Sequence, residues 1–171
     1  MAKLASYAEG LDPAPVTGWW NTDRNQYNPP PPEPLIELTE AQWAERLAGP
    51  WAVAGGALVA YTPPPTPAQA IADRIAQGAT IQPLGAVLSL TPGAVTALRE
   101  VAVDVNAGFG LPNDAAVYPA QCVGGAVCDL TEAEVVAAYR GVRDLTAAIR
   151  SQGAAMEAGR EPVWPEQTIT L

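Results

Sequence analysis

Four stretches of the chain repeat apolar side chains at the three- and four-residue spacing of amphipathic helices. Each stretch begins at a threonine, namely Thr39, Thr66, Thr91 or Thr131. A threonine hydroxyl placed before a helix accepts a hydrogen bond from a backbone N–H that would otherwise be unpaired. The pattern predicts helices over residues 40–48, 67–77, 92–107 and 132–158. Gly49, Gly78 and Gly108 follow three of these stretches, where glycine is favoured as a left-handed cap.

The phrase LTEAQWAERLAG, which starts at Leu38, returns as LTEAEVVAAYRG at Leu130. In both copies the threonine is followed three residues later by Gln42 or Glu134, which is the capping-box pattern. The distance between the copies fits no regular tandem repeat. We therefore interpret the phrase as a mark of helix starts.

The third predicted helix contains VAVDV (101–105), whose strict alternation is also typical of a strand. Val95, Leu98, Ala102 and Val105 nevertheless form a stripe on one helix face, and that stripe follows a good cap. We favour the helix.

Shorter apolar runs predict strands. WAVAGGALVAY has Gly55-Gly56 between two such runs, which indicates a hairpin. VTGWWNT (16–22) is predicted to pair with KLASY (3–7), and AVLSL (86–90) to be a short strand. AVYPAQCVGGAVCDL (116–130) predicts a second hairpin.

Two proline clusters divide the chain. We expect a β-rich N-terminal unit over 1–61 with a proline-rich break at 28–34, then a proline linker at 62–67. Residues 68–171 are expected to form a mixed domain with about three helices, short antiparallel hairpins and an extended tail at 161–171. The predicted fold class is α+β.

Charge and composition limit the partners, metal sites and activities that can be expected. The net charge of −9 and the lack of a basic patch disfavour nucleic acid as a partner. No apolar run reaches the roughly 18 residues of a membrane span. The chain has no histidine, and its two cysteines alone cannot complete a four-ligand zinc site. We therefore expect no catalytic residue, no metal, no cofactor and no enzymatic activity.

Cys122 and Cys128 flank VGGAV and should lie on opposing strands, one residue out of direct register. They could form a disulfide if their Cα atoms lie within roughly 7 Å. Two small buried thiols are the interpretation we favour.

The tryptophans could form a ligand platform, or they could pack together as the core of the N-terminal unit. Trp19 and Trp20 are adjacent on a predicted strand, so they should point to opposite faces and only one can enter the core. Aromatic side chains are also enriched at protein interfaces. The candidate interface residues are Trp19, Trp20, Trp43, Trp51, Trp164, Ile169 and Leu171.

VTGWWNTDRNQY, a proline break, LIELTEAQWAERL and WAVAGGALVAYTPPP together resemble a segment common in tail-gene clusters of tailed bacteriophages and prophages. The resemblance covers about residues 12–65, and the context of Thr39 and Trp43 is its most specific part. The C-terminal half is similar, by layout, to a domain found with that segment. Such relatives often carry W-x-D-x-x-G before the second glycine hairpin, where this chain has Tyr118 and QCVGG.

The resemblance implies a protein associated with the phage tail or tail fibre. It would be folded in the cytoplasm of the bacterial host, located in the virion tail, and bound to other tail or fibre proteins as a homo-oligomer or hetero-oligomer. Two alternatives stay open. One is a carbohydrate-binding module for a host-surface glycan, and the other is a fibre-assembly chaperone absent from the mature virion.

Overall fold

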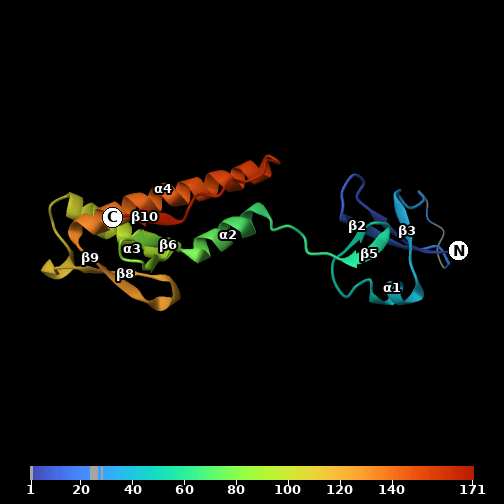
Figure 1. The fold of residues 1–171 in the computed structure, drawn as a ribbon, viewed down its shortest axis with the longest axis horizontal. Coiled ribbons are helices and arrows are strands. Elements are labelled where there is room, and N and C mark those ends of the chain that lie inside the picture. The colour runs from blue at the N-terminus through green and yellow to red at the C-terminus, as the bar shows by residue number, and fades with distance from the viewer. Residues whose placement is uncertain (1, 24–26, 28) are drawn as a thin grey trace. The chain divides into compact units, whose positions relative to one another are not determined.

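The computed structural model describes residues 2–23, 27 and 29–171. It divides the chain into two compact units, Met1–Pro64 and Pro65–Leu171. Strands dominate the first unit, whereas the second combines helices with short sheets (Figure 1). The predicted α+β fold class is confirmed.

The first unit is a curled antiparallel sheet with one short helix. Its elements are β1 (Lys3–Tyr7), β2 (Ala14–Asn21), β3 (Leu35–Glu37), α1 (Glu40–Glu45), β4 (Trp51–Ala54) and β5 (Ala57–Ala60). The strand order is β3-β1-β2-β4-β5. The predicted pairing of β1 with β2 and the hairpin at Gly55-Gly56 are both confirmed. β3 was not predicted from the sequence.

The buried side chains of the first unit are mostly small. They are Ala5, Ser6, Ala14, Leu38, Ala52 and Val53. None of Trp19, Trp20, Trp43 and Trp51 is fully buried. The buried core of the first unit is therefore built mainly from small side chains, and the four indoles do not form it.

The second unit packs three helices against short sheets (Figure 1). Its helices are α2 (Pro67–Gln77), α3 (Pro92–Asn106) and α4 (Glu132–Glu157), with short 3-10 turns at Pro112–Asp114 and Val123–Gly125. β10 (Thr168–Thr170), β6 (Ala79–Gln82) and β7 (Val87–Leu88) form one sheet, in that order. β8 (Tyr118–Gln121) and β9 (Val127–Leu130) form the predicted second hairpin. None of the described helices is long and apolar enough to span a membrane.

The four threonines are the N-cap residues of their helices, but the expected cap bond at Thr91 is corrected, since its side chain makes none. Thr39, Thr66 and Thr131 each form a capping box, and VAVDV is helical. α2 ends at Gly78, whose φ of 74° is left-handed. α1 is shorter than expected because it ends with Arg46 as its cap, so Gly49 does not close it.

The C-terminal tail pairs with its own unit. β10 lies parallel to β6, with Ile169 opposite Ile81. The Ile169 side chain is only 4% exposed, and the Leu171 N–H donates to the Gln82 carbonyl at 3.0 Å. The expectation that Ile169 offers apolar surface to another chain is thus corrected, because this side chain already fills the core of its own unit.

Candidate functional site

Aromatic and proline side chains of the first unit line an open cavity of about 450 Å³. Three of the lining residues are Trp19, Trp51 and Tyr61. The remainder are Pro15, Val16, Gly49, Pro50 and Pro63, so no lining side chain carries a charge. The cavity therefore presents flat, uncharged aromatic and proline surfaces.

The register of three strands places these residues at one end of the sheet. Pro15 on β2 pairs with Ala52 on β4, and Trp51 pairs with Ala60 across the β4–β5 hairpin. The Tyr61 N–H then donates to the Pro50 carbonyl at 3.0 Å, which extends the hairpin by one pair. Trp51 and Tyr61 consequently lie near the start of β2, and Trp19, further along β2, lines the same cavity.

The Trp51 indole lends the cavity little hydrogen-bonding capacity. Its Nε1 is buried and has no hydrogen-bond partner among the residues that the structure describes. Such an unpaired buried donor costs about 1–3 kcal/mol. Because that N–H is covered, Trp51 offers an occupant of the cavity stacking and apolar contact.

Trp20 is held inside the first unit by its own polar end. Its Nε1 donates to Ser6 Oγ at 3.1 Å, and that oxygen lies 3.0 Å from Thr17 Oγ1. The Trp20 ring also meets Tyr27 edge-on, with 5.1 Å between ring centroids. Trp20 lies outside the cavity lining, and these contacts give it a structural role.

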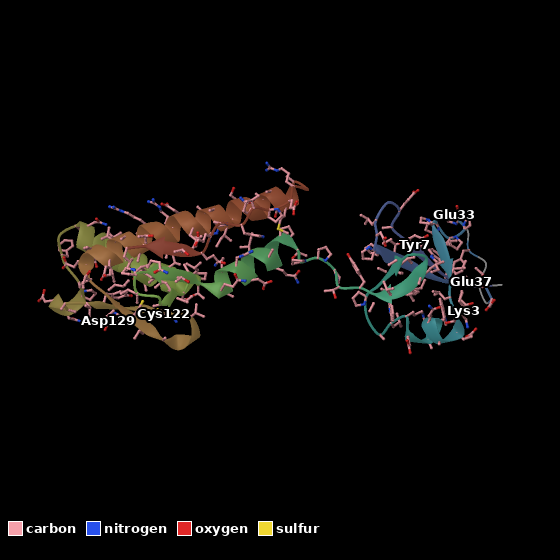
Figure 2. The ribbon with its side chains drawn as sticks, in the orientation of Figure 1. Lys3, Tyr7, Glu33, Glu37, Cys122 and Asp129 are labelled. Atoms are coloured by element: carbon pink, nitrogen blue, oxygen red, sulfur yellow. The ribbon has the colours of Figure 1, made fainter. Side chains whose placement is uncertain are left out.

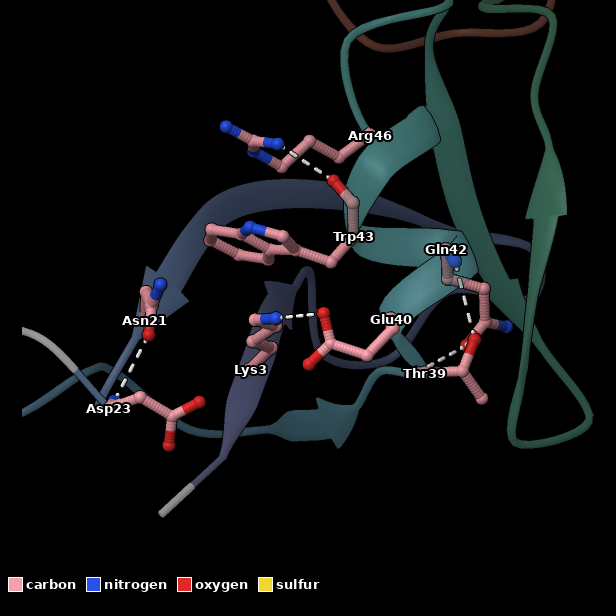
Figure 3. Close-up of polar contacts among 8 residues, drawn as sticks. All are labelled: Lys3, Asn21, Asp23, Thr39, Glu40, Gln42, Trp43 and Arg46. Carbon is pink, nitrogen blue, oxygen red and sulfur yellow. Dashed lines mark hydrogen bonds and ion pairs between the residues drawn. The ribbon is translucent and has the colours of Figure 1, made fainter.

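Trp43 is covered by a cation. The Arg46 guanidinium carbon lies 4.3 Å from the Trp43 ring centroid, and Nη1 of Arg46 donates to the Trp43 carbonyl at 2.7 Å (Figure 3). An ion pair between Lys3 and Glu40 ties the same helix to β1 (Figure 3). One face of the Trp43 indole is therefore occupied within its own unit.

The candidate residues of the second unit make their contacts within that unit. Arg74 lies over the Trp164 ring, 5.2 Å from its centroid, and Leu171 is half-buried against the core. Of the seven residues selected from the sequence, the structure brings together only Trp19 and Trp51 at one cavity.

Sequence reasoning missed Tyr61 and the three prolines of the cavity. For Pro50 and Tyr61, the predicted hairpin already contained the signal. Once the hairpin turns at Gly55-Gly56, counting outwards pairs Trp51 with Ala60 and Pro50 with Tyr61. The approach of Pro15 and Pro63 depends on the sheet order, which the local pattern does not contain.

The two cysteines, of which Figure 2 labels Cys122, are free thiols in the β8–β9 hairpin. Their Sγ atoms lie 3.0 Å apart, and they are diagonal partners because Cys128 pairs with Ala120. They are thus two residues out of register, and the single offset expected from the sequence is corrected. Burial, followed by the hydrogen bond with Cys122, raises the pKa of Cys128 to about 12. Cys128 is therefore a neutral thiol near pH 7 and a poor nucleophile.

Within the described residues, no three His, Cys, Asp or Glu side chains gather as a metal site would require. Comparison of the chain with protein-family models, curated proteins and solved structures gives no match.

Proposed function

We propose that this chain is a non-enzymatic structural protein of a bacteriophage tail or tail fibre, and that it binds another virion protein through the cavity of its first unit. The observation that carries the proposal is the convergence of Trp19, Trp51 and Tyr61 with three prolines on an open, uncharged cavity. The resemblance of residues 12–65 to phage tail-cluster segments supports the tail setting.

The occupant that best fits this lining is an extended, proline-containing segment of the partner. Aromatic grooves recognise polyproline II segments because such segments are already extended and lose little entropy on binding. Flat indole and phenol faces match the flat pyrrolidine rings of proline. The cavity also falls within the roughly 300–1,000 Å³ of ordinary binding pockets.

A polypeptide fits better than a sugar. A glycan stacks on an indole but also needs polar groups for its hydroxyls. Here the Trp51 Nε1 is buried and no lining side chain is charged. Burial of aromatic anchors against a partner chain needs no such polar set.

The shifted pKa values also favour a structural function over catalysis. The pKa of Cys128 is raised by burial, and the pKa of Glu134 is lowered by its hydrogen bonds with Thr131 in the capping box. Neither shift prepares a nucleophile or a general base near neutral pH.

The test uses the full chain and the tail and fibre proteins encoded beside its gene. Binding is measured by calorimetry for the native chain and for Trp19→Ala and Tyr61→Ala, with Trp164→Ala in the second unit as the matched control. We expect one of these proteins to bind, with an affinity about tenfold or more weaker for the cavity variants, as for aromatic anchors. Circular dichroism confirms that each variant is folded.

Two outcomes would overturn the proposal. The first is binding that Trp164→Ala weakens as much as Trp19→Ala does. The second is a tryptophan-fluorescence response to host lipopolysaccharide with none to any tail protein, which would establish the glycan-binding alternative. Mass spectrometry of purified virions then decides between a tail component, which is present, and an assembly chaperone, which is not.

A further inference from the structure

Arginine side chains gather on a second cavity, which lies wholly within the second unit. This cavity has a volume of about 310 Å³ and is lined by residues of α2, α3 and α4. Ile75, Val95 and Tyr139 are half-buried lining residues that pack against the core, and Arg99, Arg143 and Arg150 also line it. We call this cavity the arginine groove.

The concentration of positive charge is unusual for this chain. Three of its nine cationic side chains line one groove, although the net charge is −9. No acidic side chain is among the lining residues. Acidic neighbours do exist in the sequence, since Glu100 follows Arg99 and Asp144 follows Arg143.

These arginines have no acidic residue at the helical spacings that usually stabilise an exposed arginine. Acidic residues that stabilise an exposed helical arginine normally lie three or four positions away. None of the three arginines has an acidic residue at these positions. Around Arg143 and Arg150 these positions hold Tyr139, Arg140, Thr146, Ala147, Gly153 and Ala154. Around Arg99 they hold Val95, Thr96, Ala102 and Val103. Arg140 on the same helix as Arg143 and Arg150 does have Asp144 four residues later, although in the structure Asp144 pairs with Arg143.

Their hydrogen-bonding capacity is largely unused. Within the described part of the chain, Arg99 and Arg150 make no hydrogen bond or ion pair. Arg143 pairs with Asp144 at 2.8 Å, but its side chain is 60% exposed and that of Asp144 is 68% exposed. Such a solvent-exposed pair contributes little and exchanges readily.

We propose that the arginine groove binds an acidic peptide segment of a partner protein, with one apolar side chain of that segment seated between α2, α3 and α4. Guanidinium groups hold carboxylates through two parallel hydrogen bonds, which a partner's Asp or Glu supplies. The apolar surface of Ile75, Val95 and Tyr139 gives the neighbouring side chain a place to be buried. Because charge and apolar surface adjoin, a peptide with both features fits better than a free anion.

The test uses the full chain and the fluorescein-labelled peptide acetyl-Glu-Glu-Leu-Glu-Glu-amide. Fluorescence anisotropy measures its affinity for the native chain and for Arg99→Gln, Arg150→Gln and Arg140→Gln. We expect Arg99→Gln and Arg150→Gln each to weaken binding about tenfold, as for a lost charge-assisted contact. The matched control Arg140→Gln, which removes the same charge from the same helix outside the groove, should leave binding within about twofold.

Two further measurements complete the test. Replacing the peptide leucine by serine should weaken binding, and Trp19→Ala should leave it unchanged, which separates this groove from the cavity of the first unit. The proposal is overturned if the peptide does not bind, or if Arg140→Gln weakens binding as much as Arg150→Gln does. Competition by free glutarate as effective as by the unlabelled peptide would also overturn it, since the site would then recognise a small anion alone.

Discussion

Ile169 lies so close to Gly141 of α4 that a Cβ on this glycine would come within 2.5 Å of Ile169 Cγ2. Glycine in the interior of a helix costs about 1 kcal/mol relative to alanine. In this unit that cost is offset by the close seating of β10 against α4. The glycine therefore determines how near the C-terminal strand can approach the longest helix.

Replacing this glycine should loosen that contact. Gly141→Ala is expected to lower the free energy of unfolding by about 1–3 kcal/mol, because the branched Ile169 side chain cannot move away without disturbing β10. Gly93→Ala on α3 is the matched control, since a Cβ there meets nothing within 4 Å. This control should raise stability by about 0.4–1 kcal/mol. Urea unfolding measures both values, and a stabilising Gly141→Ala would contradict the packing described.

The buried side chain of the tail makes a second, independent prediction. Ile169→Ala should destabilise the second unit by about 2–5 kcal/mol, because it leaves a cavity between α4 and β6. Thr170, the next residue on β10, is exposed, so Thr170→Ala should change stability by no more than about 0.5 kcal/mol. Thermal unfolding followed by circular dichroism compares the two variants. Equal effects would mean that β10 does not dock as described.

Acid should weaken the start of α4. The Glu134 carboxylate accepts hydrogen bonds from the Thr131 N–H at 2.8 Å and from its hydroxyl at 2.7 Å, and its pKa is lowered. Since the folded-state pKa lies below the unfolded value, the stabilisation is present above the unfolded pKa and is lost as pH falls through the folded one. Glu134→Gln should therefore show a smaller loss of stability on acidification than the native chain. Coincident stability curves for the two proteins would count against this assignment.

Alkaline conditions should act through Cys128. Its pKa is raised from 9.0 to about 12 in the folded chain, so its stabilising contribution is present below pH 9 and is lost as pH rises towards 12. In a Cys122→Ala variant, which isolates this thiol, iodoacetamide at about pH 8 should react slowly with the folded chain and quickly in urea. Mass spectrometry follows the modification. Equal rates in the two conditions would show that Cys128 is exposed.

Local rules predicted the helices well because caps are local. Thr66, Pro67 and Gln69 lie within four positions of one another, so a single sequence window contains the whole signal. The same holds for the hairpin at Gly55-Gly56. The early end of α1 was not predicted because a glycine such as Gly49 suits a helix cap in any sequence. Its presence does not show that the helix extends to that residue.

Pairings between distant segments could not be predicted in this way. β6 and β10 are short strands joined in parallel, with Thr80 beside Thr168. Neither segment contains a sequence feature that identifies the strand with which it pairs. Trp164, Ile169 and Leu171 of the tail were therefore expected to contact another chain. The sites show the same limit. The aromatic identity of Trp19 and Trp51 pointed to an interface, but their convergence with Pro63, and that of Arg99 with Arg150, depends on tertiary packing.

Each unit of this chain encloses buried side chains of its own, and the junction between them falls in the proline-rich stretch between Thr62 and Pro67. Proline has no backbone N–H, so this stretch has few backbone donors that need hydrogen-bond acceptors in the flanking sequences. A recombination event within the codons of this stretch would transfer either unit intact, because it would interrupt neither a sheet nor a hydrophobic core. Related genomes can accordingly be searched for genes in which either unit is fused to a different domain.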